Sequence, residues 1–141
     1  MILLQRFMMK SFLDLGMQPL ANKYLLKPRK LSKKNNELYH LEVMFDTKTK
    51  LVSLNKKIPV KKMFNSNYPY RSSMSKTMPI AFKKLSKHII KRFNPKKILE
   101  IGSNDGALIQ NFNRDNAICV EPCGNLAKIT KRRGYFTYSN Y

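Results

Sequence analysis

The segment 98–106, which reads Ile-Leu-Glu-Ile-Gly-Ser-Asn-Asp-Gly, constrains the fold more than any other part of the sequence. A short apolar run leads into a loop that has a glycine at each end, Gly102 and Gly106. Because glycine lacks a Cβ, the backbone can turn sharply there and a ligand can approach the main chain closely. Glu121 follows 19 residues after Gly102, at the end of the next apolar run. At that place in a nucleotide-binding α/β unit a carboxylate can accept hydrogen bonds from both hydroxyls of a ribose.

The residues around this loop alternate between strand-like and helix-like patterns. An apolar face of helical period starts at Ile80 and stops at Asn94-Pro95. The following segments predict strands over 97–101 and 117–121, helices over 107–112 and 125–133, and the start of a third strand over 136–138. Gly134 stands where a helix C-cap would put it. Alternating strands and helices predict an α/β fold with a parallel sheet.

The first 63 residues have a different pattern, which predicts a small and mostly β domain. Gly16 and Pro19 indicate an ordered turn between short extended pieces, and two apolar runs within 38–54 predict a hairpin. We interpret 1–9 as a strand or tail and 27–37 as a surface loop. A connector rich in Tyr, Pro and Ser over 64–79 then leads into an α/β domain over 80–141.

The loop chemistry separates two kinds of cofactor. A dinucleotide site normally has Gly-x-Gly-x-x-Gly, whereas this loop is Gly-x-x-x-Gly and contains Asp105, which would repel phosphate. Glu100 and Asp105 would form an acidic pocket that suits the sulfonium and ammonium groups of S-adenosylmethionine. An ordinary strand-to-helix turn with solvated carboxylates is the alternative, and a nicotinamide-dependent oxidoreductase is disfavoured.

The charge balance suggests a second function class. Lys and Arg number 28 against 8 Asp and Glu, a formal net charge of +20, which favours polyanions such as nucleic acid. The excess also fits compositional drift, because it comes mainly from Lys alongside many Asn and Ile. The basic residues occur in small groups, at 27–34, 56–62, 83–97 and 128–133, and form no single stripe. A basic nucleic-acid-binding protein stays as the alternative, although no helix-turn-helix, zinc-finger or RNA-binding aromatic motif is present.

The cysteine content and the N-terminal residues bear on the cellular compartment and on membrane association. Only Cys119 and Cys123 are present, too few for a disulfide framework, so we expect the reducing cytoplasm. The apolar start is interrupted by Lys10, Ser11 and Asp14 too early for a membrane span, so no membrane association is expected.

Four motifs occur in the order seen in the S-adenosylmethionine-dependent sugar C-methyltransferases, and nearly the whole chain resembles their N-terminal part. These motifs are Phe-Leu-Asp-Leu-Gly-Met-Gln-Pro-Leu-Ala-Asn at 12–22, Tyr-Pro-Tyr-Arg-Ser-Ser at 68–73, Leu-Glu-Ile-Gly-Ser-Asn-Asp-Gly at 99–106 and Val-Glu-Pro at 120–122. The resemblance implies an incomplete class I methyltransferase sheet of the Rossmann-like type, preceded by a degenerate zinc-binding-like domain. The family methylates a carbon of a nucleotide-linked sugar.

The resemblance also implies roles for single residues. The methionine end of S-adenosylmethionine would be lined by Glu100, Gly102, Ser103, Asn104 and Gly106, with Asp105 supporting the loop and Glu121 taking the ribose hydroxyls. The pocket would be covered by Tyr68, Tyr70, Ser72 and Ser73, with Tyr70 pointing inward; packing between domains is the alternative for the tyrosines.

The sequence departs from this family in two respects. The family's zinc domain has two Cys-x-x-Cys pairs, but Asp46 and Thr49 occupy the positions of one pair and the N-terminal segment has no Cys, so we predict no zinc. The chain also stops at or before the third strand, which predicts an uncovered sheet edge that a second polypeptide or a homo-oligomer would cover. No catalytic base is identified, because neither His40 nor His88 matches the family's downstream catalytic region.

Overall fold

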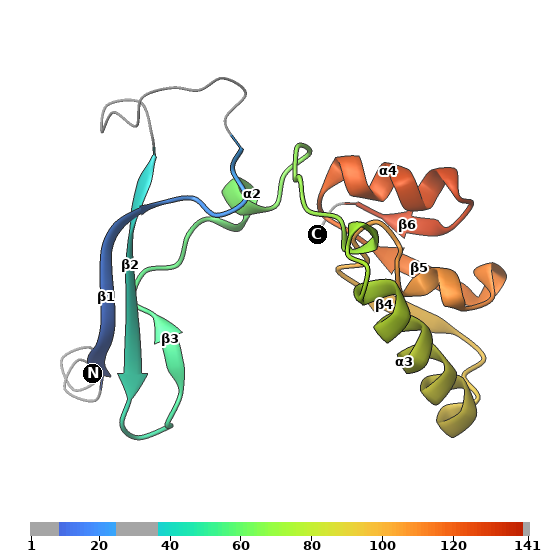
Figure 1. Cartoon of the computed structure of the whole chain (residues 1–141), viewed down its shortest axis with the longest axis horizontal. Helices are drawn as coiled ribbons and strands as arrows, with labels where there is room; N and C mark the ends of the chain where they lie inside the picture. Colours follow the sequence, from blue (N-terminus) through green and yellow to red (C-terminus); the bar gives the residue numbers. More distant parts are fainter. Residues whose placement is uncertain (1–8, 25–36, 140–141) are drawn as a thin grey trace. The chain divides into compact units, whose positions relative to one another are not determined.

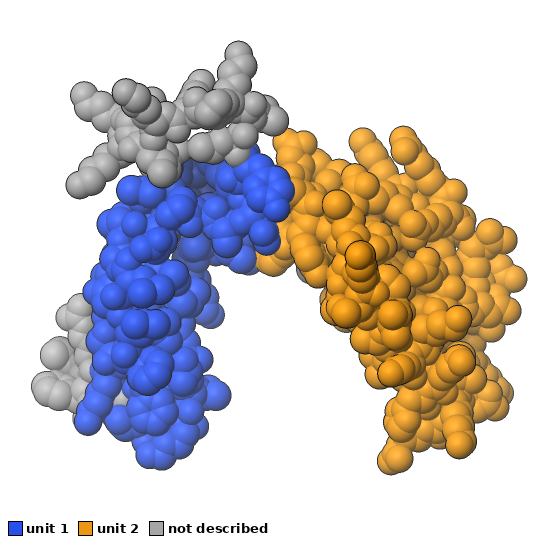
Figure 2. Space-filling view, viewed as in Figure 1, with its two compact units in different colours: residues 1–63 blue, residues 64–141 orange. Residues whose placement is uncertain are grey.

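The computed structural model describes residues 9–24 and 37–139, in two compact units that span residues 1–63 and 64–141 (Figure 2). We call these unit 1 and unit 2. Almost all of the strand or tail expected over 1–9 and of the loop expected over 27–37 lies outside the described residues. Within the described residues no helix is both long enough and apolar enough to cross a membrane.

Unit 1 is an antiparallel sheet with a short helix after it. Its strands are β1 (Met9–Pro19), β2 (Leu38–Asp46) and β3 (Val52–Leu54), in the order β1-β2-β3, and the helix is α2 (Val60–Met63) (Figure 1). The expected hairpin over 38–54 is confirmed, with Phe45 opposite Val52.

The break expected at Gly16 and Pro19 is wrong, because β1 runs through Gly16 and ends at Pro19. The pairing register with β2 shifts between Asp14 and Met17, which marks a bulge. Gly16 accommodates the bulge with a φ of +66°, and its amide donates to Asp14 Oδ1 at 2.8 Å. Proline has no amide hydrogen to donate to the neighbouring strand, so at the last position of β1 few hydrogen bonds of the sheet are lost.

Unit 2 contains the expected parallel sheet. Its strands are β4 (Ile98–Ile101), β5 (Ala117–Val120) and β6 (Phe136–Tyr138), in the order β4-β5-β6, and its helices are α3 (Met78–Phe93) and α4 (Gly124–Arg132) (Figure 1). Three short 3-10 turns complete it: Ser72–Met74, Ile109–Asn111 and Arg114–Asn116.

The helix ends in unit 2 follow the expected signals. Helix α3 begins two residues before Ile80, since Pro79 is tolerated in the first turn. It ends where Asn94 adopts a left-handed φ of 40° and its amide donates to the Ile90 carbonyl at 3.0 Å. Gly134, with a φ of +85°, follows α4 as expected.

The helix expected over 107–112 is wrong, since only the 3-10 turn Ile109–Asn111 forms there. Polar side chains compete for the backbone acceptors at this point. Asn111 Nδ2 donates to the carbonyls of Ala107 and Leu108, at 3.2 and 2.9 Å, and Gln110 Nε2 also donates to Ala107. Such local bonds favour turns over a continuing helix.

The core of unit 2 lies on one face of the parallel sheet. Ile109, Ala117 and Cys119 are buried together, and Ile98, Phe112 and Tyr135 pack against them. Helix α4 contributes buried Leu126, Ala127 and Thr130, and Thr130 Oγ1 lies 2.9 Å from Thr137 Oγ1 of β6. This places both α4 and the turn 109–111 on the same side of the sheet.

Candidate functional site

The loop 102–106 follows β4, and three of its residues have left-handed backbone conformations. The amides of Gly102 and Ser103 both donate to the Val120 carbonyl, at 2.8 and 3.2 Å, which holds the loop at the end of β5. Gly102, Asn104 and Gly106 have φ values of +75°, +51° and +82°. A Cβ on Gly102 would meet nothing within 4 Å, so the space beside this glycine is open.

Glu121 binds this loop to the end of β5. Its side chain is buried, Oε2 accepts from the Asn104 amide at 2.7 Å, and Oε1 accepts from the Cys123 amide at 2.8 Å. Each carboxylate oxygen has a second lone pair, so capacity for a further donor remains. In this structure, however, the residue expected to take ribose hydroxyls holds two backbone amides.

The connector residues 70–73 are hydrogen-bonded to the same loop. Asn104 Oδ1 accepts from the Ser72 amide at 3.0 Å, and Asn104 Nδ2 donates to the Tyr70 carbonyl at 3.3 Å. The Asp105 carboxylate accepts from the amide and the hydroxyl of Ser73. Asp105 is only 1% exposed, so its carboxylate is enclosed by these contacts. The structure therefore joins two sequence motifs that lie about 30 residues apart.

Tyr68 and Tyr70 accept hydrogen bonds through their backbone carbonyls. The Tyr68 carbonyl accepts from Asn125 Nδ2 at 2.7 Å, and the Tyr68 ring lies 5.5 Å from the Phe64 ring. Tyr70 contributes its carbonyl, and its side chain is 45% exposed.

Glu100 has a different environment from the other acidic residues. It lines a cavity of about 250 Å³ with Ile89, Leu108, Ile109 and Phe112. Its Oε2 is buried and has no hydrogen-bond partner. Burial raises the pKa of Glu100 to about 7, the nearby charge of Glu121 adds to the rise, and a bond from the Ile109 amide opposes it. The carboxyl is thus half-protonated near neutral pH and has an oxygen available to a donor.

Glu100 and Asp105, which were expected to form an acidic pocket, differ in their hydrogen-bond partners. Asp105 is closed in by Ser73, while Glu100 keeps its unpartnered Oε2. The hydroxyl of Ser103, which is 2% exposed, has no nitrogen or oxygen partner and is hydrogen-bonded to the buried thiol of Cys119. Of the two carboxylates, Glu100 therefore keeps an oxygen that can accept from a ligand.

Sequence reasoning missed two residues that hold the site together. Arg133 Nη1 donates to the Asp105 carbonyl at 2.8 Å, and Asn125 is bonded to Tyr68. Arg133 belongs to a basic run at the end of a predicted helix, which looks like an ordinary helix terminus. Asn125 follows Gly124 at a helix start and has no pattern that distinguishes it from other asparagines.

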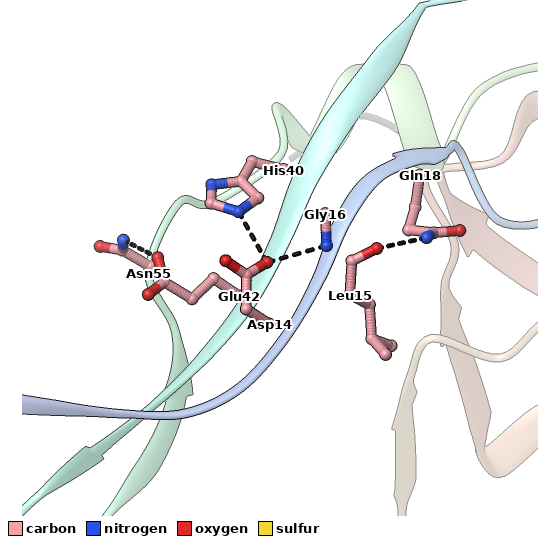
Figure 3. A network of polar contacts seen from close by, with 7 residues as sticks. All are labelled: Asp14, Leu15, Gly16, Gln18, His40, Glu42 and Asn55. Atoms are coloured by element: carbon pink, nitrogen blue, oxygen red, sulfur yellow. Dashed lines mark hydrogen bonds and ion pairs between the residues drawn. The ribbon is translucent and has the colours of Figure 1, made fainter.

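Unit 1 contains a separate group of polar contacts, shown in Figure 3. His40 Nε2 lies 2.7 Å from Asp14 Oδ1, and Asn55 Nδ2 donates to the Glu42 carboxylate. In Figure 3 the His40 ring points towards the Asp14 carboxylate.

A second polar group closes the turn between β2 and β3. Asp46 Oδ1 accepts from the amides of Lys48 and Thr49, at 2.8 and 3.1 Å. These two amide bonds lower the pKa of Asp46, the Thr49 amide most.

Comparison with known proteins gives one finding for this N-terminal part. Residues 6–64 match the family model Methyltransf_13, described as "Putative zinc binding domain". This match covers nearly all of unit 1 and supports a methyltransferase association for it. No curated protein matches the chain.

The residues present do not fit the zinc ion that this description implies. Segment 6–64 contains no cysteine, and the two cysteines of the chain are buried in unit 2. Burial raises the pKa of Cys123 to about 12, and Glu121 adds to the rise, so this thiol stays protonated. His40 and Asp46 have hydrogen-bond partners, and the described ranges 9–24 and 37–139 hold no cluster of three potential metal ligands. We therefore assign zinc no role.

Proposed function

We propose that unit 2 binds S-adenosylmethionine and that the chain belongs to a methyltransferase system that acts on a carbon of a nucleotide-linked sugar. The methyltransferase association of residues 6–64 supports the reaction class. The resemblance of the four motifs to sugar C-methyltransferases supports the acceptor class. The hydrogen-bonded loop at the ends of β4 and β5 supports the place of binding.

The observation that carries this proposal is the buried, unpartnered Oε2 of Glu100. A buried carboxylate oxygen without a donor costs free energy, and a cation beside it would recover that cost. Glu100 lies two residues before Gly102, beside which space is open, and this position favours a ligand that carries an ammonium or sulfonium group.

Each residue of the site has a defined task in this proposal. Glu100 would accept from the cationic methionine end, and Ser103 would offer its hydroxyl. Glu121 would use its remaining lone pairs for the ribose hydroxyls while it holds Asn104 in place. When bound, S-adenosylmethionine supplies a methyl group on a positively charged sulfur. No residue is assigned as the base that would activate the acceptor carbon.

Isothermal titration calorimetry of the full chain tests the proposal. We expect S-adenosylmethionine to bind, and Glu100→Gln to weaken it roughly 10- to 100-fold, the usual effect of losing a charge-assisted hydrogen bond. Asp115→Asn is the matched control, because this carboxylate is exposed and lies outside the loop. Absence of binding by the wild-type chain, with a folded circular dichroism spectrum, would contradict cofactor binding.

The pH dependence of binding provides a second, independent prediction. A cation needs the ionised form of Glu100, and the pKa of this carboxyl is about 7. The ionised fraction therefore rises from about one tenth at pH 6 to about nine tenths at pH 8, and the affinity should rise roughly ninefold over this range. Calorimetry across this pH range should show a flat profile for Glu100→Gln. A wild-type profile that falls with rising pH would show that Glu100 does not face the cation.

A further inference from the structure

One face of the parallel sheet in unit 2 consists of six apolar or aromatic side chains. Successive side chains of a strand point to opposite faces, and the parallel register aligns two rows across the three strands. The rows on this face are Leu99, Ile118 and Phe136, and Ile101, Val120 and Tyr138. The rings of Phe136 and Tyr138 lie 4.9 Å apart in an edge-to-face contact, which confirms that they share a face.

This face, which we call the open sheet face, is exposed to solvent. Leu99, Ile101, Phe136 and Tyr138 are 59%, 70%, 60% and 54% exposed. The opposite face carries buried Ala117, Cys119 and Thr137 beneath α4 and the turn 109–111. Parallel sheets are normally covered on both faces, and a contiguous apolar patch of several hundred Å² marks an interaction surface.

The six side chains that form the open sheet face are uncharged. Helix α4 lies on the other side of the sheet, because Thr130 contacts Thr137 there, and its exposed cations Lys128, Lys131 and Arg132 belong to that side. An acidic partner would therefore find no cation among these six side chains, and Lys97, which lines the same cavity as Leu99, lies only at the edge of the face. A second, equally apolar copy of the same face is complementary to it.

We propose that two copies of this chain associate through their open sheet faces in a symmetric, face-to-face dimer. Such an interface uses the same patch on both copies, with the sheets about 10 Å apart. The four most exposed side chains offer roughly 100 Å² each and the other two less, so a dimer would bury on the order of 1,000 Å², the lower limit for a specific interface. In this arrangement the α4 cations of the two copies lie on the outer sides, which limits their repulsion.

Sedimentation velocity of the full chain tests this proposal. We expect a reversible dimer with a dissociation constant in the micromolar range, as suits a small apolar interface. Dimerisation should strengthen as NaCl rises from about 0.05 to about 0.5 M, because salt screens the repulsion between two chains of net charge +20. A contact with a polyanion or an acidic protein would weaken with salt instead.

Matched variants locate the interface. Phe136→Lys should raise the dissociation constant at least 10-fold, and Leu99→Lys serves the same purpose should the first variant not fold. Ile80→Lys is the control, since Ile80 on α3 is equally exposed, at 60%, but lies outside the open sheet face. A wild-type monomer at about 200 μM in about 0.5 M NaCl would overturn the proposal. So would equal dissociation by Ile80→Lys, or a dimer that persists in both Phe136→Lys and Leu99→Lys.

Discussion

Two carboxylates at the ends of neighbouring strands, Glu100 and Glu121, differ in what their oxygens contact. Both oxygens of Glu121 accept backbone amides, so its charge is compensated by the loop that it holds. Glu100 has one oxygen without a donor, and burial raises its pKa to about 7. Glu121 therefore holds the loop in place and keeps only its remaining lone pairs for a ligand, whereas Glu100 has a whole oxygen without a donor.

The raised pKa of Glu100 predicts how the stability of unit 2 depends on pH. The folded-state pKa of about 7 lies above the ordinary 4.5, so the folded state binds the proton more tightly than the unfolded state. The resulting stability is fully present below pH 4.5 and is lost as the pH rises through 7. Glu100→Gln should therefore stabilise unit 2 at pH 8 by about 1 kcal/mol, after a discount for partial exposure, and change little at pH 4.

Thermal unfolding followed by the near-ultraviolet dichroism of tyrosine measures this effect, since the chain has no tryptophan. A Glu100→Gln chain that is less stable than the wild type at pH 8 would contradict the assigned environment of Glu100.

Asp105 predicts a structural phenotype at the same loop. Its buried carboxylate accepts from the amide and hydroxyl of Ser73, so Asp105→Asn places an amide donor against donors. The expected loss is about 1–3 kcal/mol of stability, with faster hydrogen exchange at the amides of 72–73 and 103–105. Ser73→Ala should give a smaller loss, because the Ser73 amide bond remains. Asp115→Asn, at an exposed site, should leave exchange in this loop unchanged.

The turn of the β2–β3 hairpin is closed by hydrogen bonds to a single side chain, Asp46. Asp46 Oδ1 holds the amides of Lys48 and Thr49, while the Asp46 backbone pairs with Lys50 and Leu51. A side-chain oxygen that accepts amides two and three residues later stabilises such a turn without a metal.

Asp46→Ala should open this turn, because two amides lose their acceptor. We expect hydrogen exchange at Lys48 and Thr49 to accelerate roughly tenfold, while Asp46→Asn, which keeps an acceptor oxygen, should change it little. The lowered pKa of Asp46 means that the stabilisation is present above its ordinary pKa of 3.8 and is lost as the pH falls below it. A metal chelator should leave wild-type exchange unchanged; acceleration by the chelator would show that the turn depends on a metal.

The elements that the sequence predicted well have strong local signals. Helix α3 has a regular apolar period and a stop at Asn94-Pro95, and β4 and β5 are short apolar runs beside a glycine loop. The two wrong predictions, the turn at Gly16 and the helix over 107–112, occur where a local interaction competes with the regular element. At Gly16 a bulge absorbed the glycine within a strand, and at Asn111 side-chain bonds to the backbone replaced a helix. Neither outcome is encoded in hydrophobic periodicity.

At the scale of the whole molecule, the chain has two compact units that carry the same sign of charge. The net charge of +20 suggested a polyanion ligand, but the three acidic residues Glu100, Asp105 and Glu121 gather around one loop of unit 2. None of the six side chains of the open sheet face is charged. Added salt screens the repulsion between two copies of net charge +20, so salt should favour association of the chain with itself.

The sequence by itself determined the parallel sheet, the glycine loop, the absence of cysteine ligands in the N-terminal unit and most of the residues that meet at the loop. These features depend on residue type and short-range spacing, which a single chain displays directly. Only the tertiary structure decided which carboxylates are satisfied and which sheet face is exposed. Hydrogen-bond partners such as Ser73, Asn125 and Arg133 lie about 30 to 60 residues from the groups they bind, and packing chooses among them.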